Sequence, residues 1–144
     1  MRRAPVAVGT DVADWNQTVI DTFRANGGEV PQFGRSLVLL HHVGARTGTE
    51  RVSPVMGFPV DGGWLVVASK AGAPEHPAWF GNLRANPRTT VETPDDGVVE
   101  VTAEELPPAE REVAWARITA QAPGFADYEA RTTRVIPVVR LTRR

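Results

Sequence analysis

The sequence predicts a single α+β domain built on a strongly curved, mostly antiparallel sheet, or small barrel, of about six strands. Three observations lead to this prediction. The chain has 144 residues, which is the length of one domain. Short segments rich in β-branched residues and leucine alternate with glycine-containing turns, as in hairpin-connected strands. Amphipathic patterns at the start and between the later strands indicate helices that cover the sheet.

The first half of the chain begins with a predicted amphipathic helix over residues 11–26. Its apolar residues recur at three- and four-residue steps, Thr10 is placed to cap its start, and the glycines that follow it provide a stop. The strands expected next cover residues 36–43, 51–60 and 64–69, with a hairpin turn at 61–63. Residues 1–33 are thus expected to form a variable helix and linker ahead of the sheet.

The second half of the chain is expected to mix helices with hairpins. A helix is predicted over residues 77–86, because Pro77 suits a first helical turn and Pro87 stops the helix. The remaining expected elements are strands at 89–93 and 98–103, a helix opening at Pro107, a short helix that follows the break at 123–124, and a last strand at 134–141.

The residue types present exclude several kinds of chemistry. The chain has no cysteine, so disulfides, thiolate catalysis and cysteine-ligated metals are ruled out. His41 and His42 are adjacent in a predicted strand, so their side chains point to opposite faces and cannot grip one metal ion. We expect no metal site and two histidines that are satisfied within the protein. No nucleophile elbow, Walker loop or dinucleotide-binding glycine motif supports a hydrolase, kinase or nicotinamide-dependent function.

The charge balance and the apolar pattern bear on partners and location. The chain has 16 basic and 17 acidic residues, whereas a nucleic-acid-binding domain usually carries a basic excess. No apolar run reaches the length of a membrane helix, and the N-terminus lacks a signal-peptide pattern, so a cytoplasmic location is expected. Peripheral membrane association through the Trp15 face is the alternative, which the acidic residues of the first helix disfavour.

The loop after the first predicted strand is the most informative candidate for ligand binding. Gly44 and Gly48 would let backbone N–H groups turn inward as a small anion-binding nest. Thr47 adds a hydroxyl, and Arg46 and Arg51 add forked donors suited to phosphate or carboxylate. The alternative is an ordinary hairpin loop with surface arginines.

Two further segments place polar groups beside apolar ones. Ser69 and Lys70 end a very apolar predicted strand, where a polar group is well placed to meet a ligand. The alternative there is a strand end with one snorkelling lysine. Ala78 and Asn82 lie one turn apart on the predicted helix and would line a flat pocket, whereas core packing also explains the neighbouring Trp79.

Five segments occur in the order and spacing of a known family. They are residues 44–48, 51–54, 67–72, 77–87 and 134–139, which read GARTG, RVSP, VASKAG, PAWFGNLRANP and RVIPVV. In these segments the chain resembles the deazaflavin-dependent nitroreductase family. The resemblance implies a split β-barrel over residues 34–144 that binds coenzyme F420, an 8-hydroxy-5-deazaflavin with a phosphate and an oligoglutamate tail. It also implies hydride transfer from the reduced coenzyme to quinones and, incidentally, to nitroaromatics.

The resemblance implies roles for individual residues as well. The residues that would hold the phosphate and tail are Arg46, Thr47, Gly48 and Arg51. The residues that would edge the deazaflavin ring are Ser53, Pro54, Val67, Ala68 and Ser69, with Lys70 nearby. The residues that would close the pocket are Ala78, Trp79 and Asn82. Ser69 and Tyr128 are the candidates for the chemical step, since a hydroxyl there would donate a hydrogen bond to the acceptor oxygen. Phe125 falls where the family often has a ring-contacting tyrosine.

Two other functions are compatible with the same barrel. One is an oxidoreductase that binds flavin mononucleotide, because a fold does not determine its function. The other is a non-catalytic carrier or sensor of F420. The resemblance favours an enzyme that reduces quinone-like acceptors with F420, because a coenzyme that supplies the hydride needs neither a catalytic triad nor a metal beside it.

Overall fold

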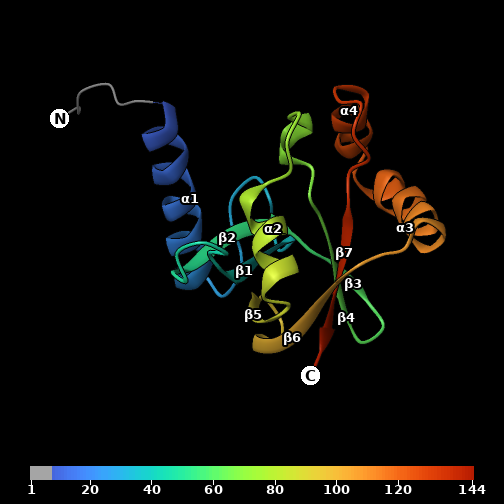
Figure 1. Cartoon of the computed structure of the whole chain (residues 1–144). Coiled ribbons are helices and arrows are strands. Elements are labelled where there is room, and N and C mark those ends of the chain that lie inside the picture. Colours follow the sequence, from blue (N-terminus) through green and yellow to red (C-terminus); the bar gives the residue numbers. More distant parts are fainter. Residues whose placement is uncertain (1–7) are drawn as a thin grey trace.

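A computed structural model describes residues 8–144, with side chains from residue 14 onward. In this part of the chain the helices are α1 (Val8–Ala25), α2 (Ala78–Ala85), α3 (Pro108–Gln121) and α4 (Gly124–Ala130), with a 3₁₀ turn, η1 (Lys70–Gly72). The strands are β1 (Leu37–Val43), β2 (Glu50–Met56), β3 (Phe58–Val60), β4 (Gly63–Val67), β5 (Arg88–Thr93), β6 (Gly97–Glu105) and β7 (Val138–Arg143). Figure 1 shows α1 on one side of the strands and α3 and α4 on the other.

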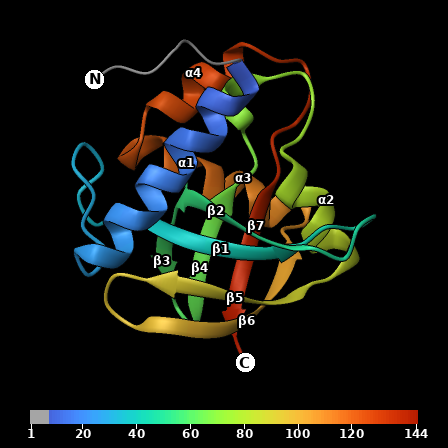
Figure 2. The ribbon, with the colours of Figure 1, turned by 90° about the vertical axis from the view of Figure 1, so that its left-hand side faces the viewer.

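The strands of residues 8–144 form one antiparallel sheet in the order β2-β1-β5-β6-β7-β4-β3. The two outermost strands, β2 and β3, follow each other in the chain, and β2 also contacts β4. The sheet therefore curls into a half-barrel, in which β1 and β5 cross in front of β4 and β7 (Figure 2). The predicted α+β fold with a curved antiparallel sheet is confirmed.

The predicted strand over residues 51–60 is wrong as a single strand, because the chain breaks at Gly57. The strand before the break pairs with β1, and the strand after it pairs with β4. The Gly57 N–H donates to the Ser36 carbonyl at 2.9 Å. A Cβ on Gly57 would lie 2.8 Å from a methyl group of Val38, so glycine allows the close approach at which the chain changes its pairing partner.

The last predicted strand begins later than expected. It was predicted over residues 134–141 and instead spans Val138–Arg143. Pro137 has no N–H to give to a ladder, but its carbonyl accepts a hydrogen bond from the Ala68 N–H at 2.9 Å. Residues 134–137 thus run alongside the end of β4 as an irregular segment.

The first helix ends where the sequence predicts and begins earlier. It starts at Val8, so Thr10 lies inside the helix and its predicted capping role is wrong. At the other end Gly27 and Gly28 have φ of 63° and 98°, and the Gly28 N–H donates to the Phe23 carbonyl at 2.8 Å. A left-handed pair of glycines with this hydrogen bond is a common helix stop.

A series of contacts between ionisable side chains connects α1 to the sheet. Arg24 donates from Nε and Nη2 to the two carboxylate oxygens of Glu92 on β5, at 3.1 and 2.6 Å. His41 on β1 lies between Glu92, at 2.7 Å, and Glu50, at 3.2 Å. The hydrogen bond from Arg24, followed by that from His41, holds the pKa of Glu92 below its ordinary value. These contacts link the first helix to three strands.

The buried apolar side chains form three clusters, one under each group of helices. One lies between the sheet and α2, a second lies under α3 and α4, and a third lies under α1. None of the helices within residues 8–144 is long and apolar enough to cross a bilayer.

Candidate functional site

The loop between β1 and β2 is shaped by its own hydrogen bonds. The Gly48 N–H donates to the Gly44 carbonyl at 2.9 Å, and the Thr49 N–H donates to the Thr47 hydroxyl at 3.2 Å. The Ala45 N–H donates to a side chain on α2. The predicted anion-binding nest is wrong for these N–H groups, because each already has an acceptor in the protein.

Two cationic side chains, one in this loop and one just after it on β2, are available to a ligand. Arg46 and Arg51 are both exposed, and within the described side chains neither forms an ion pair with a carboxylate. Arg35, by contrast, pairs with Asp95 at 2.6 Å. A free guanidinium presents a planar set of N–H donors that matches phosphate and carboxylate oxygens. These two side chains therefore present donors that suit an anionic group.

A line of hydrogen bonds joins this loop to α2 and β2. The Ala45 N–H donates to Oδ1 of Asn82 at 2.9 Å, and Nδ2 of Asn82 lies 2.9 Å from Nδ1 of His42. Nε2 of His42 lies 2.9 Å from Oγ of Ser53. His42 and Asn82 are buried, whereas Ser53 is only partly buried. Two predicted site residues, Asn82 and Ser53, are thus connected through a histidine.

His42 is neutral at ordinary pH. Burial lowers its pKa to about 4, with smaller contributions from the positive charge of Arg51 and from the neighbouring His41. The two histidines lie on opposite faces of β1, as predicted: His41 contacts two carboxylates, and His42 contacts Asn82 and Ser53. The metal-ligand role stays without support, since no group of ligating side chains is found among the described residues.

The end of β4 leads into a strained turn. Lys70 and Ala71 have positive φ of 46° and 54°, and Gly72 follows with 82°. Residues other than glycine seldom adopt this conformation, which costs on the order of 1–3 kcal/mol each and is often kept at functional sites. Just before them Ser69 is buried, and its backbone carbonyl accepts a hydrogen bond from Arg134 at 2.7 Å. The turn therefore places a serine hydroxyl beside a backbone that the surroundings hold in a rare conformation.

Arg134 holds this turn from the segment before β7. Its guanidinium donates to the carbonyls of Ser69 at 2.7 Å, Ala73 at 2.9 Å and Ala68 at 3.2 Å. Nη1 also lies 2.9 Å from Nδ1 of His76. One side chain thus binds both ends of the strained turn.

The other predicted residues divide between the surface and the core. Ala68 is fully buried, and Val67 and Trp79 are only 7% exposed. Ala68 and Trp79 belong to the core cluster between the sheet and α2. Ala78 is exposed one turn before Asn82, and Pro54 is partly buried on β2.

Helix α4 places Tyr128 beside the strained turn and Phe125 in the core. A Cβ on Gly72 would lie 2.7 Å from the Tyr128 carbonyl, which shows how closely the helix approaches η1. The Tyr128 ring packs edge-on against Phe125 at 5.7 Å and under Arg131. Phe125 is buried and packs against Phe58 at 6.0 Å. Phe125 is therefore a core residue here, although the resemblance placed it at a ring-contacting position.

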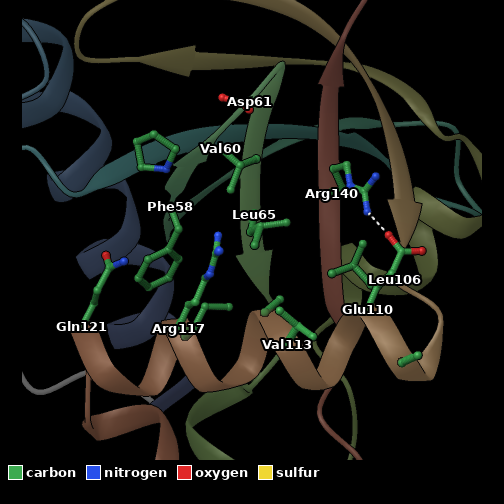
Figure 3. Close-up of a pocket in the computed structure, with 14 residues that line it drawn as sticks. Phe58, Val60, Asp61, Leu65, Leu106, Glu110, Val113, Arg117, Gln121 and Arg140 are labelled. Atoms are coloured by element: carbon green, nitrogen blue, oxygen red, sulfur yellow. Dashed lines mark hydrogen bonds and ion pairs between the residues drawn. The ribbon is translucent and has the colours of Figure 1, made fainter.

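A hollow of the described surface lies elsewhere (Figure 3). It is a mostly apolar groove of about 580 Å³ between α3 and the strands β3, β4 and β7. Its lining includes Phe58, Leu65 and Val113, and an ion pair between Arg140 and Glu110 at 2.6 Å lies at its edge. None of the predicted site residues lines it.

The curled half-barrel is the split β-barrel that a solved F420-H2-dependent reductase also has. Within that fold class the chain belongs to the F420H(2)-dependent quinone reductase family, whose sequence model matches residues 15–143. The chain is therefore an F420-dependent oxidoreductase that acts on quinones, and the predicted coenzyme is confirmed.

Relatives with known names or structures agree with this assignment. An F420H(2)-dependent quinone reductase of Mycobacterium tuberculosis is 36% identical over 121 residues, which cover 82% of this chain and 80% of the relative. A solved F420-H2-dependent reductase is 38% identical and has a TM-score of 0.66, with 74% of this chain and 94% of that chain covered. Another solved chain, described as a domain-swapped dimer, is 34% identical with a TM-score of 0.70 and covers 92% and 98%.

Two residues that contact the predicted site residues were not assigned to the site from the sequence. His42 was expected to be a satisfied polar side chain, which it is, but its partners are the predicted site residues Asn82 and Ser53. Arg134 begins the family segment 134–139, but no role was predicted for it. No pattern in the sequence could have found its contacts with a turn that lies more than 60 residues earlier in the chain.

Proposed function

We propose that F420 lies between the β1–β2 loop and the strained turn at η1, and that the chain there directs hydride from the reduced coenzyme to a quinone. The observation that carries this placement is the pair of exposed, unpaired guanidiniums of Arg46 and Arg51. Arg46 lies on the loop that Asn82 fixes to α2, and Arg51 follows that loop on β2. In this arrangement the arginines bind the phosphate and the tail.

The ring of the coenzyme would meet the polar groups at the ends of the neighbouring strands. Ser53 and Pro54 face it from β2, and Val67 and Ser69 face it from the end of β4, since β2 and β4 are in contact. Bound F420H2 supplies the hydride. The protein then has to orient the reactants, exclude water and provide a donor for the acceptor oxygen. Ser69 and Tyr128 are the hydroxyls proposed for that donor.

A titration distinguishes this proposal from its two alternatives. We expect the fluorescence of F420 to report tighter binding than that of flavin mononucleotide, because the loop arginines can follow a long anionic tail. Tighter binding of flavin mononucleotide would favour the flavin enzyme instead. The second arm mixes reduced F420 with a soluble menaquinone analogue. Binding without oxidation of the coenzyme would identify a carrier.

A further inference from the structure

We propose that His42 is a positioning residue, which holds the Ser53 hydroxyl as a hydrogen-bond donor toward the coenzyme. This inference rests on the proposed function, because it takes the coenzyme to lie against Ser53. His42 itself is only 3% exposed. It would act through Ser53, which is partly buried on β2.

The direction of the hydrogen bonds is set at one end by the backbone. The Ala45 N–H can only donate, so the atom of Asn82 that it meets at 2.9 Å is the carbonyl oxygen. The amide nitrogen of Asn82 therefore faces His42 and donates to Nδ1 at 2.9 Å. A ring nitrogen that accepts carries no proton, so the proton of the neutral imidazole is on Nε2.

This tautomer decides what the serine can do. Nε2–H of His42 donates to Oγ of Ser53 at 2.9 Å, so the lone pairs of that hydroxyl face inward. Its own proton has no acceptor among the described residues and is left for a ligand. If the imidazole had the other tautomer, Ser53 would be the donor to Nε2 and would present only an acceptor outward.

The groups around His42 keep it in this state. From β2 it meets the positive charge of Arg51, from β1 the ring of His41, and from α2 the neutral amide of Asn82. A protonated His42 would donate from Nδ1 as well, against the N–H groups of Asn82. Burial and the positive neighbour disfavour that form, consistent with the lowered pKa of His42, about 4.

The adjacent histidine provides a matched control. His41 is bonded to Glu50 and Glu92, which anchor α1 and belong to no part of the proposed site. His41→Gln should therefore disturb the sheet and the helix without changing the Ser53 hydroxyl. A general effect of replacing a histidine in β1 would appear in both variants.

The test compares two replacements of His42 whose side chains differ in length. The measurements are fluorescence titration with F420 and thermal unfolding. His42→Asn keeps a polar group near Nδ1 but loses the donor to Ser53, and we expect F420 binding to weaken about 5- to 10-fold, close to Ser53→Ala. His42→Gln keeps a donor near Nε2, so it should recover part of that loss. Ser53→Thr keeps a hydroxyl, so it should recover part of the affinity that Ser53→Ala loses. His41→Gln should bind F420 like the wild type.

The double variant shows whether the two residues act together. Adding His42→Asn to Ser53→Ala should weaken binding no further, because the hydroxyl that His42 positions is already gone. Equal losses in His42→Asn and His42→Gln, or additive losses in the double variant, would mean that His42 only packs. Normal F420 binding by Ser53→Ala would also overturn the inference. This variant removes only one oxygen, from a partly buried side chain. If the wild type does not bind F420 at all, the proposed function fails instead.

Discussion

Nη2 of Arg134 donates to the carbonyl oxygen of Ser69 at 2.7 Å, across 65 residues of chain. The same guanidinium binds the carbonyls of Ala68 and Ala73. It therefore bridges the two ends of the turn in which Lys70 and Ala71 have positive φ. The segment before β7 holds in place a backbone that would otherwise relax.

Replacing Arg134 should loosen this turn more than the fold. A hydrogen bond to a charged group contributes about 1.5–3 kcal/mol, and Arg134→Gln removes most of the contacts to Ser69, Ala73 and Ala68. We expect F420 affinity to fall at least tenfold, and amide hydrogen exchange to rise first at residues 69–73. The measurements are a fluorescence titration and native-state hydrogen exchange.

Arg140→Gln is the control for Arg134→Gln. Arg140 pairs with Glu110 on the surface of the groove, and an exposed ion pair contributes about 0–1 kcal/mol. This variant has the same change of charge and should bind F420 normally. If it weakens F420 as much as Arg134→Gln does, the effect comes from charge and not from the turn.

Arg46 of the β1–β2 loop and Arg51 at the start of β2 should account for much of the salt dependence of binding. Arg46→Ala and Arg51→Ala should each weaken F420 binding, by about 1.5–3 kcal/mol for each charged hydrogen bond that is lost. Added salt should weaken the wild type more than either variant, because these exposed charges are screened. Titrations at low and high ionic strength measure both effects.

Arg117→Ala makes the matched comparison for the loop arginines. Arg117 lines the groove beside α3, away from the loop, and its removal changes the net charge by the same amount. Its affinity should equal that of the wild type at each salt concentration. Wild-type affinity in both loop variants at low salt would reduce the loop to an ordinary hairpin.

Much of the fold was predictable from local patterns, and the failures arise from long-range contacts. The positions of glycine and proline predicted the hairpins and the ends of helices. The break at Gly57 was not predictable, because the residues on both sides read as one continuous strand. The chain changes partner there because Val38 and Ser36, from another strand and its lead-in, lie against it. Similarly, residues 134–137 contain β-branched side chains and read as a strand. They contact the end of β4 through hydrogen bonds of Arg134 and Pro137 with Ala68 instead of a regular ladder.

For the candidate site, too, local features were predictable and long-range contacts were not. The cationic loop and the strand end could be located from residue types alone. The direction of the hydrogen bonds through His42 could not, because it depends on an amide from α2 and a backbone N–H that come together only in the fold. The N–H groups of Ala45, Gly48 and Thr49 cannot form the predicted nest, because they are used to shape the loop.

Tyr128 should matter to the chemical step more than to coenzyme binding. Charge builds on the acceptor oxygen as hydride is transferred, so a phenol that donates to it stabilises the transition state specifically. We expect Tyr128→Phe to lower kcat for quinone reduction about 10- to 100-fold, or roughly 1.4–2.7 kcal/mol, with little change in F420 affinity. The ring packing against Phe125 is kept in this variant.

Ser69→Ala separates the two hydroxyls in the same assay. Ser69 lies at the turn that would edge the ring, so its loss should change both affinity and kcat. The measurement is steady-state oxidation of reduced F420 by a soluble menaquinone analogue. An unchanged kcat in Tyr128→Phe would assign the donor to Ser69 or to water.

The buried His42 should make the protein less stable as the pH falls below neutrality. Its pKa is about 4 in the folded protein against an ordinary 6.5, so the unfolded chain takes up the proton first. Stability is then fully present above about pH 6.5 and is lost as the pH falls toward 4, because the unfolded state binds more protons over that range. Urea unfolding at several pH values measures the slope, which should be smaller in His42→Gln.

Glu92 contributes in a lower and separable pH range. Its pKa is held below the ordinary 4.5, chiefly by the hydrogen bond from Arg24, so its stabilising contribution is present above pH 4.5 and is lost as the pH falls through its folded value. Glu92→Gln should therefore flatten the curve below pH 4.5 and leave the slope between pH 4.5 and 6.5 intact. His42→Gln should do the reverse. If His42→Gln keeps the wild-type slope above pH 4.5, the imidazole is not held neutral by the fold, and the Nε2–H donor to Ser53 loses its basis.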